Sequence, residues 1–353
     1  MQHFNDILVV YDCKTDNRAL FERAVWLGQR NARVNVVTVI EEPPRKEGGQ
    51  RPQPVANSQE PGIDIIEEFS HHTPQPAPLG SSADAQQHIA GTAKELSLDI
   101  QEHITQTEKP NLEQFVTAIR QSGVQVRAKT LCGTQFLEII REVIRNRHDL
   151  VVITAEGGGS LKQMLLASTA MHLMRKCPCP VWVIKPGQPK QYGRILAAVD
   201  ATATDAERDE LNTSILDMAA SLARMQQSEL LIVHTWTMCG ESLLRRRRGV
   251  LLKEEVDEIV RQTWDAHRQA LRELLRRHPV EDLNHQVYLL KGEAGALIPE
   301  LAKDREVELI VMGTLSRSGV AGMLIGHTAE KVLHRVDCSV LTVKPEGFLT
   351  PVT

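Results

Sequence analysis

The sequence contains no apolar stretch close to the roughly 18 residues that a membrane-spanning helix needs. Its first residues, MQHFNDILVVYD, carry no basic region, apolar core or cleavage site of the kind found in secretory signals. Six cysteines are spread over 353 residues without the dense spacing of a disulfide framework. These absences argue against membrane-spanning and disulfide-rich secreted proteins, and they predict a cytoplasmic protein with free thiols.

The sequence also lacks a strong excess of charge of either sign. Its formal net charge is -4 and its pI is about 6.4, which gives no general electrostatic reason to bind nucleic acid or an anionic membrane. The dense basic run at residues 245–248 stands in a chain that is only 4% aromatic, and no stacking platform accompanies it. We interpret this run as a solvated helix end and expect no nucleic-acid partner.

Motifs of the common phosphate-binding and catalytic sites are missing. The chain has no GxxxxGK(S/T) string, and no GxGxxG follows the first strand of either half. It also has no GxSxG elbow, no HExxH motif and no defensible acid/base pair. Cys177 and Cys179 could suggest a metal site, but no second Cys/His pair stands at a suitable spacing, so we expect buried thiols. The sequence therefore favours binding over fast catalysis.

What the chain does contain is an internal duplication. Residues 6–12, DILVVYD, return as residues 194–200, RILAAVD, and each run is a buried-strand pattern that ends in an aspartate before a helical pattern. Residues 179–186, CPVWVIKP, likewise match residues 338–345, CSVLTVKP. The length of the chain is also sufficient for two domains. We therefore predict two copies of one unit.

The two domains are predicted at residues 1–188 and 189–353. In each, short β-branched strands lie between helical patterns, which indicates βαβ units and a doubly wound parallel sheet in an α/β fold. The copies differ in their insertions. Residues 43–87 are rich in Pro, Gly, Gln and Ser, which predicts a flexible surface segment, whereas residues 253–277 have the apolar spacing of one long amphipathic helix.

The best candidate site follows the fourth strand of the second copy. Ligands of doubly wound sheets bind where the strand order reverses, and this point would bring Asp200 close to Gly313. Gly313 has no side chain to obstruct a ribose or phosphate. Residues 326–328, Gly-His-Thr, would begin the last helix with free N–H groups that suit a phosphate. Arg317, in the loop between them, could neutralise phosphate charge.

The glycine loop, the strand-ending aspartate and the duplication together resemble the universal stress protein family. The string LMRKCP at residues 173–178 is similar to the tandem, E-type members. The resemblance covers nearly the whole chain except the insertions, and it implies a HUP/Rossmann-like strand order of 3-2-1-4-5 in each unit. It also implies that residues 181–185 pair with residues 340–344, so that the two units form an intramolecular pseudo-dimer with pseudo-twofold symmetry.

The resemblance also assigns the site residue by residue. Asp200 would face the adenine base, although it could instead only cap the following helix, and Thr235 would stand where a small apolar residue flanks the base. Ser316 takes the place of the second loop glycine. His327, where the family has serine or threonine, is either a phosphate partner or merely the start of a helix. The predicted nucleotide-binding residues are Asp200, Thr235, Met312, Gly313, Ser316, Arg317, Gly326, His327 and Thr328.

The first copy keeps less of this pattern. Its loop has Thr154 and Ala167 in place of the first and last glycines, although Asp12 and Ser168 persist. The triple glycine at residues 157–159 could be simple flexibility. We expect this half to bind ATP poorly or not at all, and its own ligand stays open.

The resemblance therefore implies a stress-response protein whose C-terminal unit binds ATP with magnesium. It would act as a sensor or adaptor through unidentified protein partners and without fast catalysis. A weak ATP hydrolase or phosphotransferase that uses the same pocket is one alternative. A scaffold with vestigial pockets, or with a ligand other than a nucleotide, is the other. Further oligomerisation and the nature of the stress stay open.

Overall fold

In the computed structural model, both copies of the unit belong to one compact body that comprises residues 1–41 and 106–353. The residues that the structure describes are 4–40, 109–155, 169–202, 205–246, 252–314 and 326–352. The insertion at residues 43–87 lies outside them, as do Ser316 and Arg317, so what the sequence predicts for these residues stays a prediction.

The first copy alternates strands with helices in the order that its sequence pattern predicts. Residues 109–121 form a further helix between the second and third strands. The other elements are β1 (Asp6–Val10), α1 (Arg18–Gly28), β2 (Arg33–Ile40), β3 (Val126–Cys132), α3 (Gln135–Asn146), β4 (Leu150–Thr154), α5 (Thr169–Lys176) and β5 (Val181–Ile184).

The second copy repeats this order, and between its second and third strands it has the short helix α7 and the long helix α8. Its elements are β6 (Arg194–Ala198), α6 (Ala206–Gln226), β7 (Glu229–Trp236), α7 (Glu241–Arg246), α8 (Lys253–Arg277), β8 (His285–Lys291), α9 (Ala294–Asp304), β9 (Leu309–Gly313), α10 (His327–Leu333) and β10 (Ser339–Val343). The long helix predicted at residues 253–277 is α8, and its bounds are those predicted.

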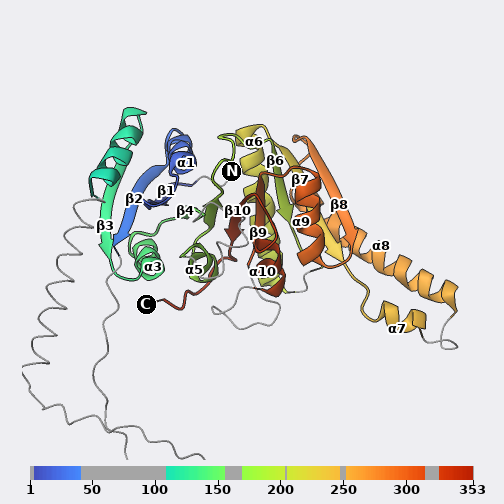
Figure 1. Ribbon diagram of the computed structural model, residues 1–353. Coiled ribbons are helices and arrows are strands. Elements are labelled where there is room, and N and C mark those ends of the chain that lie inside the picture. The colour runs from blue at the N-terminus through green and yellow to red at the C-terminus, as the bar shows by residue number, and fades with distance from the viewer. Residues whose placement is uncertain are drawn as a thin grey trace, which may run out of the picture. The chain divides into compact units, whose positions relative to one another are not determined.

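The strands of the described residues form one sheet in the order β3-β2-β1-β4-β5-β10-β9-β6-β7-β8 (Figure 1). Each half therefore has the order 3-2-1-4-5 that the resemblance implies. Within each half, the neighbouring strands are parallel. The α/β fold with two doubly wound parallel sheets is confirmed.

The two halves are joined by β5 and β10, which pair antiparallel as predicted. Trp182 lies opposite Leu341, and these two residues occupy equivalent positions in the duplicated sequence, as a pseudo-twofold relation requires. The two parallel sheets thus meet edge to edge and make one ten-stranded sheet among the described residues. This pairing removes two edges that would otherwise expose unpaired backbone groups.

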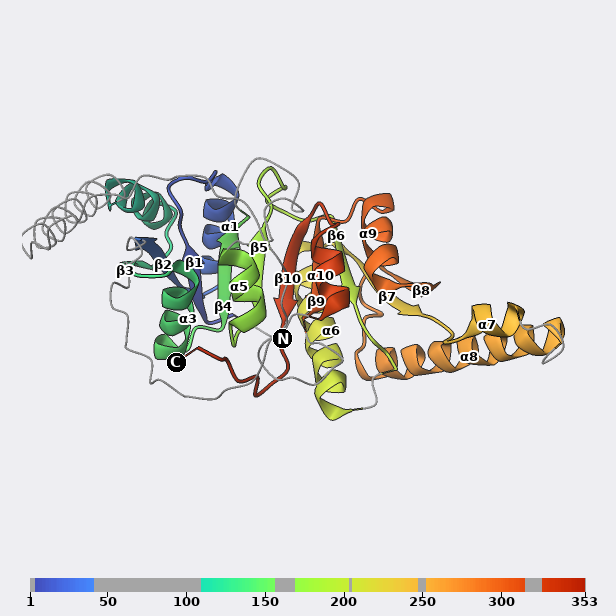
Figure 2. The same cartoon turned by 60° about the horizontal axis from the view of Figure 1, so that its bottom comes forward.

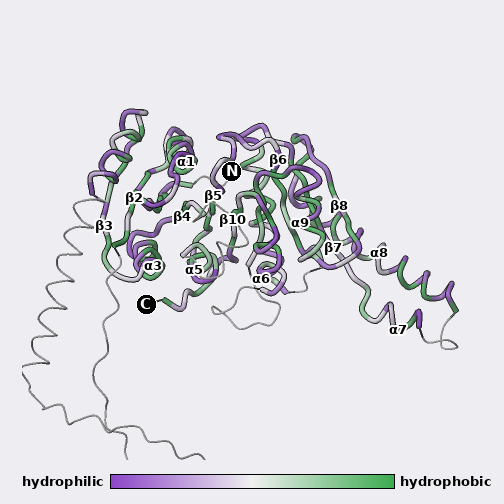
Figure 3. Tube along the Cα trace, viewed as in Figure 1, coloured by the Kyte–Doolittle hydropathy of each residue, from purple (hydrophilic) through white to green (hydrophobic). Residues whose placement is uncertain are grey.

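Two apolar cores lie on the two faces of this sheet, because successive strand residues point to opposite faces. One core joins α1, α6 and part of the helix at residues 109–121 to strand residues such as Ile7 and Ile195. The other joins α3, α5, α9 and α10 to strand residues such as Leu8 and Leu196. Figure 3 shows the hydrophobic residues along the central strands. Each core includes residues of both copies, so the two units share a hydrophobic interior.

Helix α8 is the longest helix among the described residues, and Figures 1 and 2 show it running past the edge strand β8. Its C-terminal half packs Leu271 and Leu274 into the first core. Nearer its start, Val256 is buried. The apolar side chains recur at helical spacing, which explains why the sequence pattern defined this helix so well.

The cysteines are free thiols, and Cys177, Cys179 and Cys338 are buried, as predicted for the cysteines near the last strands. Burial raises the pKa of the Cys338 thiol to about 12. Among the described residues, no helix is both long and apolar enough to cross a membrane.

Candidate functional site

A cavity of about 290 Å³ opens at the carboxyl ends of β6, β7 and β9, where the strand order of the second copy reverses. Much of its lining is apolar and includes Leu211, Ile215 and Ile298. Ser316 and Arg317 lie outside the described residues. The other seven predicted nucleotide-binding residues all line this cavity: Asp200, Thr235, Met312, Gly313, Gly326, His327 and Thr328.

A second cavity, of about 360 Å³, adjoins the first and shares several of its residues, including Asp200. Its further lining is polar, with His267 of α8, Glu293 before α9 and Lys331 of α10. Lys331 Nζ forms an ion pair with Glu293 Oε2 at 3.3 Å. The site therefore has an apolar part against α6 and a polar part toward α8 and α10.

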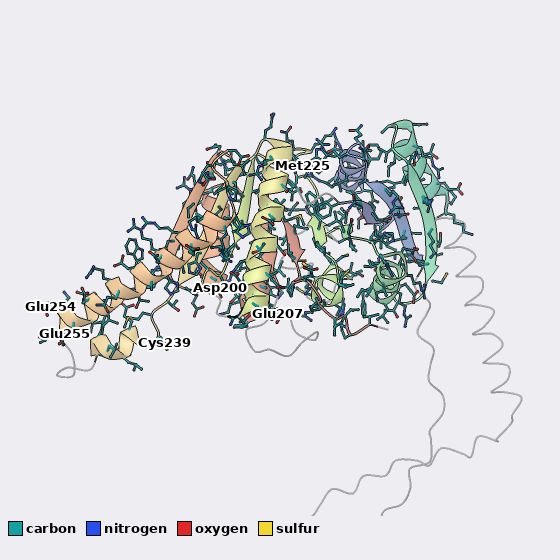
Figure 4. All side chains as sticks on the ribbon, turned by 180° about the vertical axis from the view of Figure 1, so that it is seen from behind. Asp200, Glu207, Met225, Cys239, Glu254 and Glu255 are labelled. Carbon is teal, nitrogen blue, oxygen red and sulfur yellow. The ribbon has the colours of Figure 1, made fainter. Side chains whose placement is uncertain are left out.

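Asp200 lies at the centre of this site and is half-buried. Figure 4 shows it near Glu207 in the first turn of α6, whereas Met225 marks the opposite end of that helix. Asp200 is not the N-cap of α6, because Asp205 has that role and its side chain accepts a hydrogen bond from the Arg208 N–H at 2.9 Å. The capping alternative for Asp200 is therefore wrong.

Gly313 ends β9 beside the cavity, and its missing side chain has a packing consequence. A Cβ atom at this position would lie 2.6 Å from Cδ2 and 3.1 Å from Cγ of Leu211, closer than packed carbon atoms approach each other. The glycine thus allows α6 to lie close to the end of β9. From the sequence, we interpreted Gly313 as a position that lets a ligand approach closely. The structure shows a second reason for glycine here, which is the close packing of Leu211 on α6.

Gly326 is the N-cap of α10, so the last helix begins where the sequence predicts. Its N–H donates to the carbonyl oxygen of Thr314 at 2.9 Å, so α10 begins next to the residue that follows β9. Its φ of -60° and ψ of 139° are extended backbone values that any residue can adopt. His327 and Thr328 follow it and are exposed at the cavity.

Sequence reasoning missed several polar residues of the site, among them Arg208, Asn212, His234, His267, Glu293 and Lys331. Of these, His234 left a signal, because it is the single imidazole in the apolar strand pattern LLIVHTW. Its side chain is only 2% exposed, and its Nε2 atom lies 2.8 Å from Nδ1 of His267. The contribution of His267 was not predictable, since it depends on how α8 packs on the sheet.

The corresponding aspartate of the first copy has a local structural role. The Asp12 side chain accepts a hydrogen bond from the Lys14 N–H at 2.9 Å, and the Asn17 side chain donates to the Asp12 carbonyl oxygen at 2.7 Å. These contacts shape the turn before α1. Residues 157–159, Ala167 and Ser168 of this copy lie outside the described residues.

Comparison with solved structures agrees with this architecture. A protein of unknown function from Pseudomonas aeruginosa PAO1 matches with a TM-score of 0.63 and 21% identity, over 98% of this chain and 94% of that one. A universal stress protein from Archaeoglobus fulgidus DSM 4304 matches with a TM-score of 0.55 and 16% identity, over 97% of this chain and 96% of that one. At these identities the matches support the fold.

Comparison of sequences identifies the family. The Universal stress protein E of Escherichia coli strain K12 is 27% identical over 234 residues, which are 65% of this chain and 72% of that protein. The model of the family described as the universal stress protein family matches residues 70–185 and 191–344, one segment in each copy. The chain therefore belongs to the universal stress protein family, as a tandem, E-type member with two copies of the family's domain.

Proposed function

We propose that the C-terminal unit binds ATP with magnesium in the pocket around Asp200, and that the protein is a stress-response sensor or adaptor without fast catalysis. The observation that carries this proposal is the convergence of Asp200, Gly313 and Gly326 on one cavity at the switch point of the sheet. These positions are far apart in the sequence. Membership of the universal stress protein family supports the stress-response role.

The two adjoining cavities match the two chemical ends of a nucleotide. Leu211, Ile215 and Ile298 offer apolar surface for a base, and the half-buried carboxylate of Asp200 can accept hydrogen bonds from an amino group or a ribose hydroxyl. On the polar side, Lys331 carries a positive charge suited to phosphates.

Magnesium would enter this site with the phosphates. Within the part of the chain that the structure describes, no group of three or more His, Cys, Asp or Glu side chains is placed to hold a metal ion. Nucleotide-bound magnesium commonly uses phosphate oxygens and water with one or two carboxylates. Glu293, which lines the polar cavity, is one carboxylate available for this purpose.

We propose further that the working pocket belongs to a domain of residues 189–353, and that the domain of residues 1–188 contributes little to ATP binding. The different surroundings of the two strand-ending aspartates support this asymmetry. Each carboxylate accepts a hydrogen bond from a residue two positions later, Asp12 from the Lys14 N–H and Asp200 from the Thr202 hydroxyl, but of these two aspartates only Asp200 lines the two cavities described above.

Calorimetric titration with ATP and magnesium tests the proposal. We expect one site per chain in the wild type and a tenfold to hundredfold weaker affinity in Asp200→Ala. This loss corresponds to about 1.5–3 kcal/mol for a hydrogen bond to a charged group. Gly326→Val should also weaken binding, because valine tolerates the extended backbone of this residue but adds a branched side chain at the cavity.

The matched control is Asp12→Ala, which removes the equivalent aspartate of the first copy and should leave ATP affinity unchanged. Equal losses from Asp12→Ala and Asp200→Ala would show that the asymmetry is wrong. No ATP binding by the wild type would favour a scaffold with vestigial pockets. Phosphate release measured in the same samples separates binding from a weak hydrolase.

A further inference from the structure

Two imidazoles from different elements form a direct hydrogen bond inside the pocket. Nε2 of His234, near the end of β7, lies 2.8 Å from Nδ1 of His267 on α8, with the ring centroids 5.1 Å apart. His234 is buried, whereas His267 lines the polar cavity together with Asp200. The ring centroid of His267 also lies 5.7 Å from that of Trp236. The inner ring is thus almost fully buried in the wall of the first cavity, and the outer ring faces the polar cavity.

The inner ring is also tied to the loop that carries Asp200. Nδ1 of His234 lies 3.3 Å from the carbonyl oxygen of Val199 and 3.4 Å from the amide nitrogen of Ala201. When Nδ1 carries a hydrogen, it donates to Val199, and Nε2 accepts from His267 Nδ1–H. When Nδ1 is bare, it accepts from Ala201, and Nε2–H donates to His267. In both neutral arrangements one hydrogen lies between the rings.

This geometry limits the pair to one additional proton. In the first arrangement the additional proton goes to Nε2 of His267, which leaves the hydrogen bond between the rings intact. A second proton would have to go to His234 Nε2, where it would face the Nδ1–H of His267. If both nitrogen atoms carried a hydrogen, neither could accept, and the hydrogen bond across the 2.8 Å between them would break. The two histidines therefore titrate as one unit.

Charged and titratable groups reach the pair from several elements. Three of the neighbouring cations are held in ion pairs: Arg208 with Asp205, Lys291 with Glu241, and Lys331 with Glu293. Burial lowers the pKa of His267, and the negative charge of Asp200 raises it. Among the described residues that line the polar cavity, the remaining titratable group is His327 on α10.

We propose that His234 and His267 act as one proton-binding unit that strengthens the binding of an anionic ligand as the pH falls. His267, supplied by the inserted helix α8, is the member of the pair that faces this ligand. The proposal rests on the proposed binding of ATP at the same site. It deepens that function by making ligand affinity depend on pH through a residue of α8.

The direction of the effect follows from linkage. Without ligand, burial lowers the pKa of His267 below its ordinary value and so favours its neutral form. A bound polyphosphate adds negative charge to the cavity and raises this pKa, so binding takes up a proton. The affinity for the ligand then increases as the pH falls from the pKa of the ligand-bound protein to the pKa of the ligand-free protein. Each unit by which the ligand raises the pKa gives up to about a tenfold increase.

The test compares wild type with His267→Gln by calorimetric titration with ATP and magnesium between pH 5.5 and pH 8, values chosen to bracket the usual histidine pKa of about 6.5. At each pH, two buffers with different ionisation heats give the number of protons taken up per ATP. The protonation of ATP itself and of His327 is common to both proteins, so the difference isolates the pair. We expect the wild type to take up more protons and to gain more affinity at low pH.

A matched control is His278→Gln, at the end of the same helix, where Nδ1 of His278 lies 3.0 Å from Asp217 and outside both cavities. It should keep the wild-type pH profile. Normal ATP binding with the same proton uptake in wild type and His267→Gln would overturn this proposal alone. No ATP binding by the wild type would overturn the proposed function and this proposal with it.

Discussion

The side-chain amide of Asn212 holds the backbone of Asp200 through two hydrogen bonds. The Asp200 N–H donates to Asn212 Oδ1 at 2.9 Å, and Asn212 Nδ2 donates to the Asp200 carbonyl oxygen at 2.7 Å. Asn212 is only 3% exposed and belongs to α6, so a rigid helix fixes the residue that ends β6. The position of the Asp200 carboxylate in the pocket thus depends on an amide group twelve residues later in the chain.

Asn212→Ala should weaken both the fold and the site. Two backbone groups of Asp200 would lose their partners, which costs about 1–3 kcal/mol for each buried group left unpaired. We expect a lower free energy of unfolding in urea and a reduced ATP affinity in calorimetry. Asn146→Ala is the control, since Asn146 donates only to Glu142 in the first copy, and it should not change ATP affinity. Unchanged ATP affinity in Asn212→Ala would contradict the positioning role.

Gly313→Ala should destabilise the protein through a clash with Leu211, whose Cδ2 atom would lie 2.6 Å from the new Cβ. Overpacking of this kind typically costs about 1–3 kcal/mol. Adding Leu211→Ala removes the atoms that clash, so the double variant should be more stable than the sum of the two single effects predicts. Urea unfolding of the four proteins measures this coupling. Additive effects would show that the protein avoids the clash between residue 313 and Leu211 by some other movement.

Lys344 should make stability rise with pH in the alkaline range. Burial lowers its pKa to about 8, while its amine donates to the Arg175 carbonyl oxygen at 3.2 Å and to the Thr314 hydroxyl. Below about pH 8 the amine is charged in both states. Between this value and the ordinary lysine pKa of about 10.4 only the unfolded chain keeps the proton, so the folded state gains up to about 3 kcal/mol.

Urea unfolding of wild type and Lys344→Met from pH 7 to pH 10.5 measures this gain as a rise in the stability of wild type relative to that of the variant. Lys185→Met is the matched control, because Lys185 occupies the equivalent position of the first copy and pairs with Asp337. A parallel dependence of wild type and Lys344→Met on pH would refute the prediction.

A chain of residues 189–353 alone should self-associate through β10. In the full chain β10 pairs with β5, and Val340 and Leu341 are almost fully buried. Without the first copy this strand becomes an exposed apolar edge, which favours pairing with a second copy of itself. Sedimentation of the fragment beside the full-length chain measures its mass, and circular dichroism checks its fold. A folded monomer would disagree with this expectation.

Much of the fold follows from patterns that are local in the sequence. The buried strand runs and the helical spacing of residues 253–277 predicted the alternating elements and the bounds of α8. The duplication located the equivalent strands β5 and β10, and the resemblance to the universal stress protein family implied that they pair. The general position of ligands in doubly wound sheets predicted that Asp200 and Gly313 would meet.

The remaining features of the site depend on contacts between distant residues. The hydrogen bond of His234 with His267 exists because α8 packs its C-terminal half against the sheet, and helical spacing does not specify where an inserted helix lies. Leu211 opposite Gly313 likewise depends on how α6 lies over β9. Asn212 has the sequence appearance of an ordinary polar residue in a helix, although it is buried.

The two copies lie in one chain and pair through β5 and β10, so mutations can change the two halves separately. In a homodimer built from one short chain, every substitution appears in both subunits, so both pockets must change together. Here the residues of each half are encoded separately, while the pairing of β5 with β10 and the shared apolar cores hold the two halves together. Asp12 and Asp200 can therefore diverge independently, and so can the segments between the second and third strands of each copy.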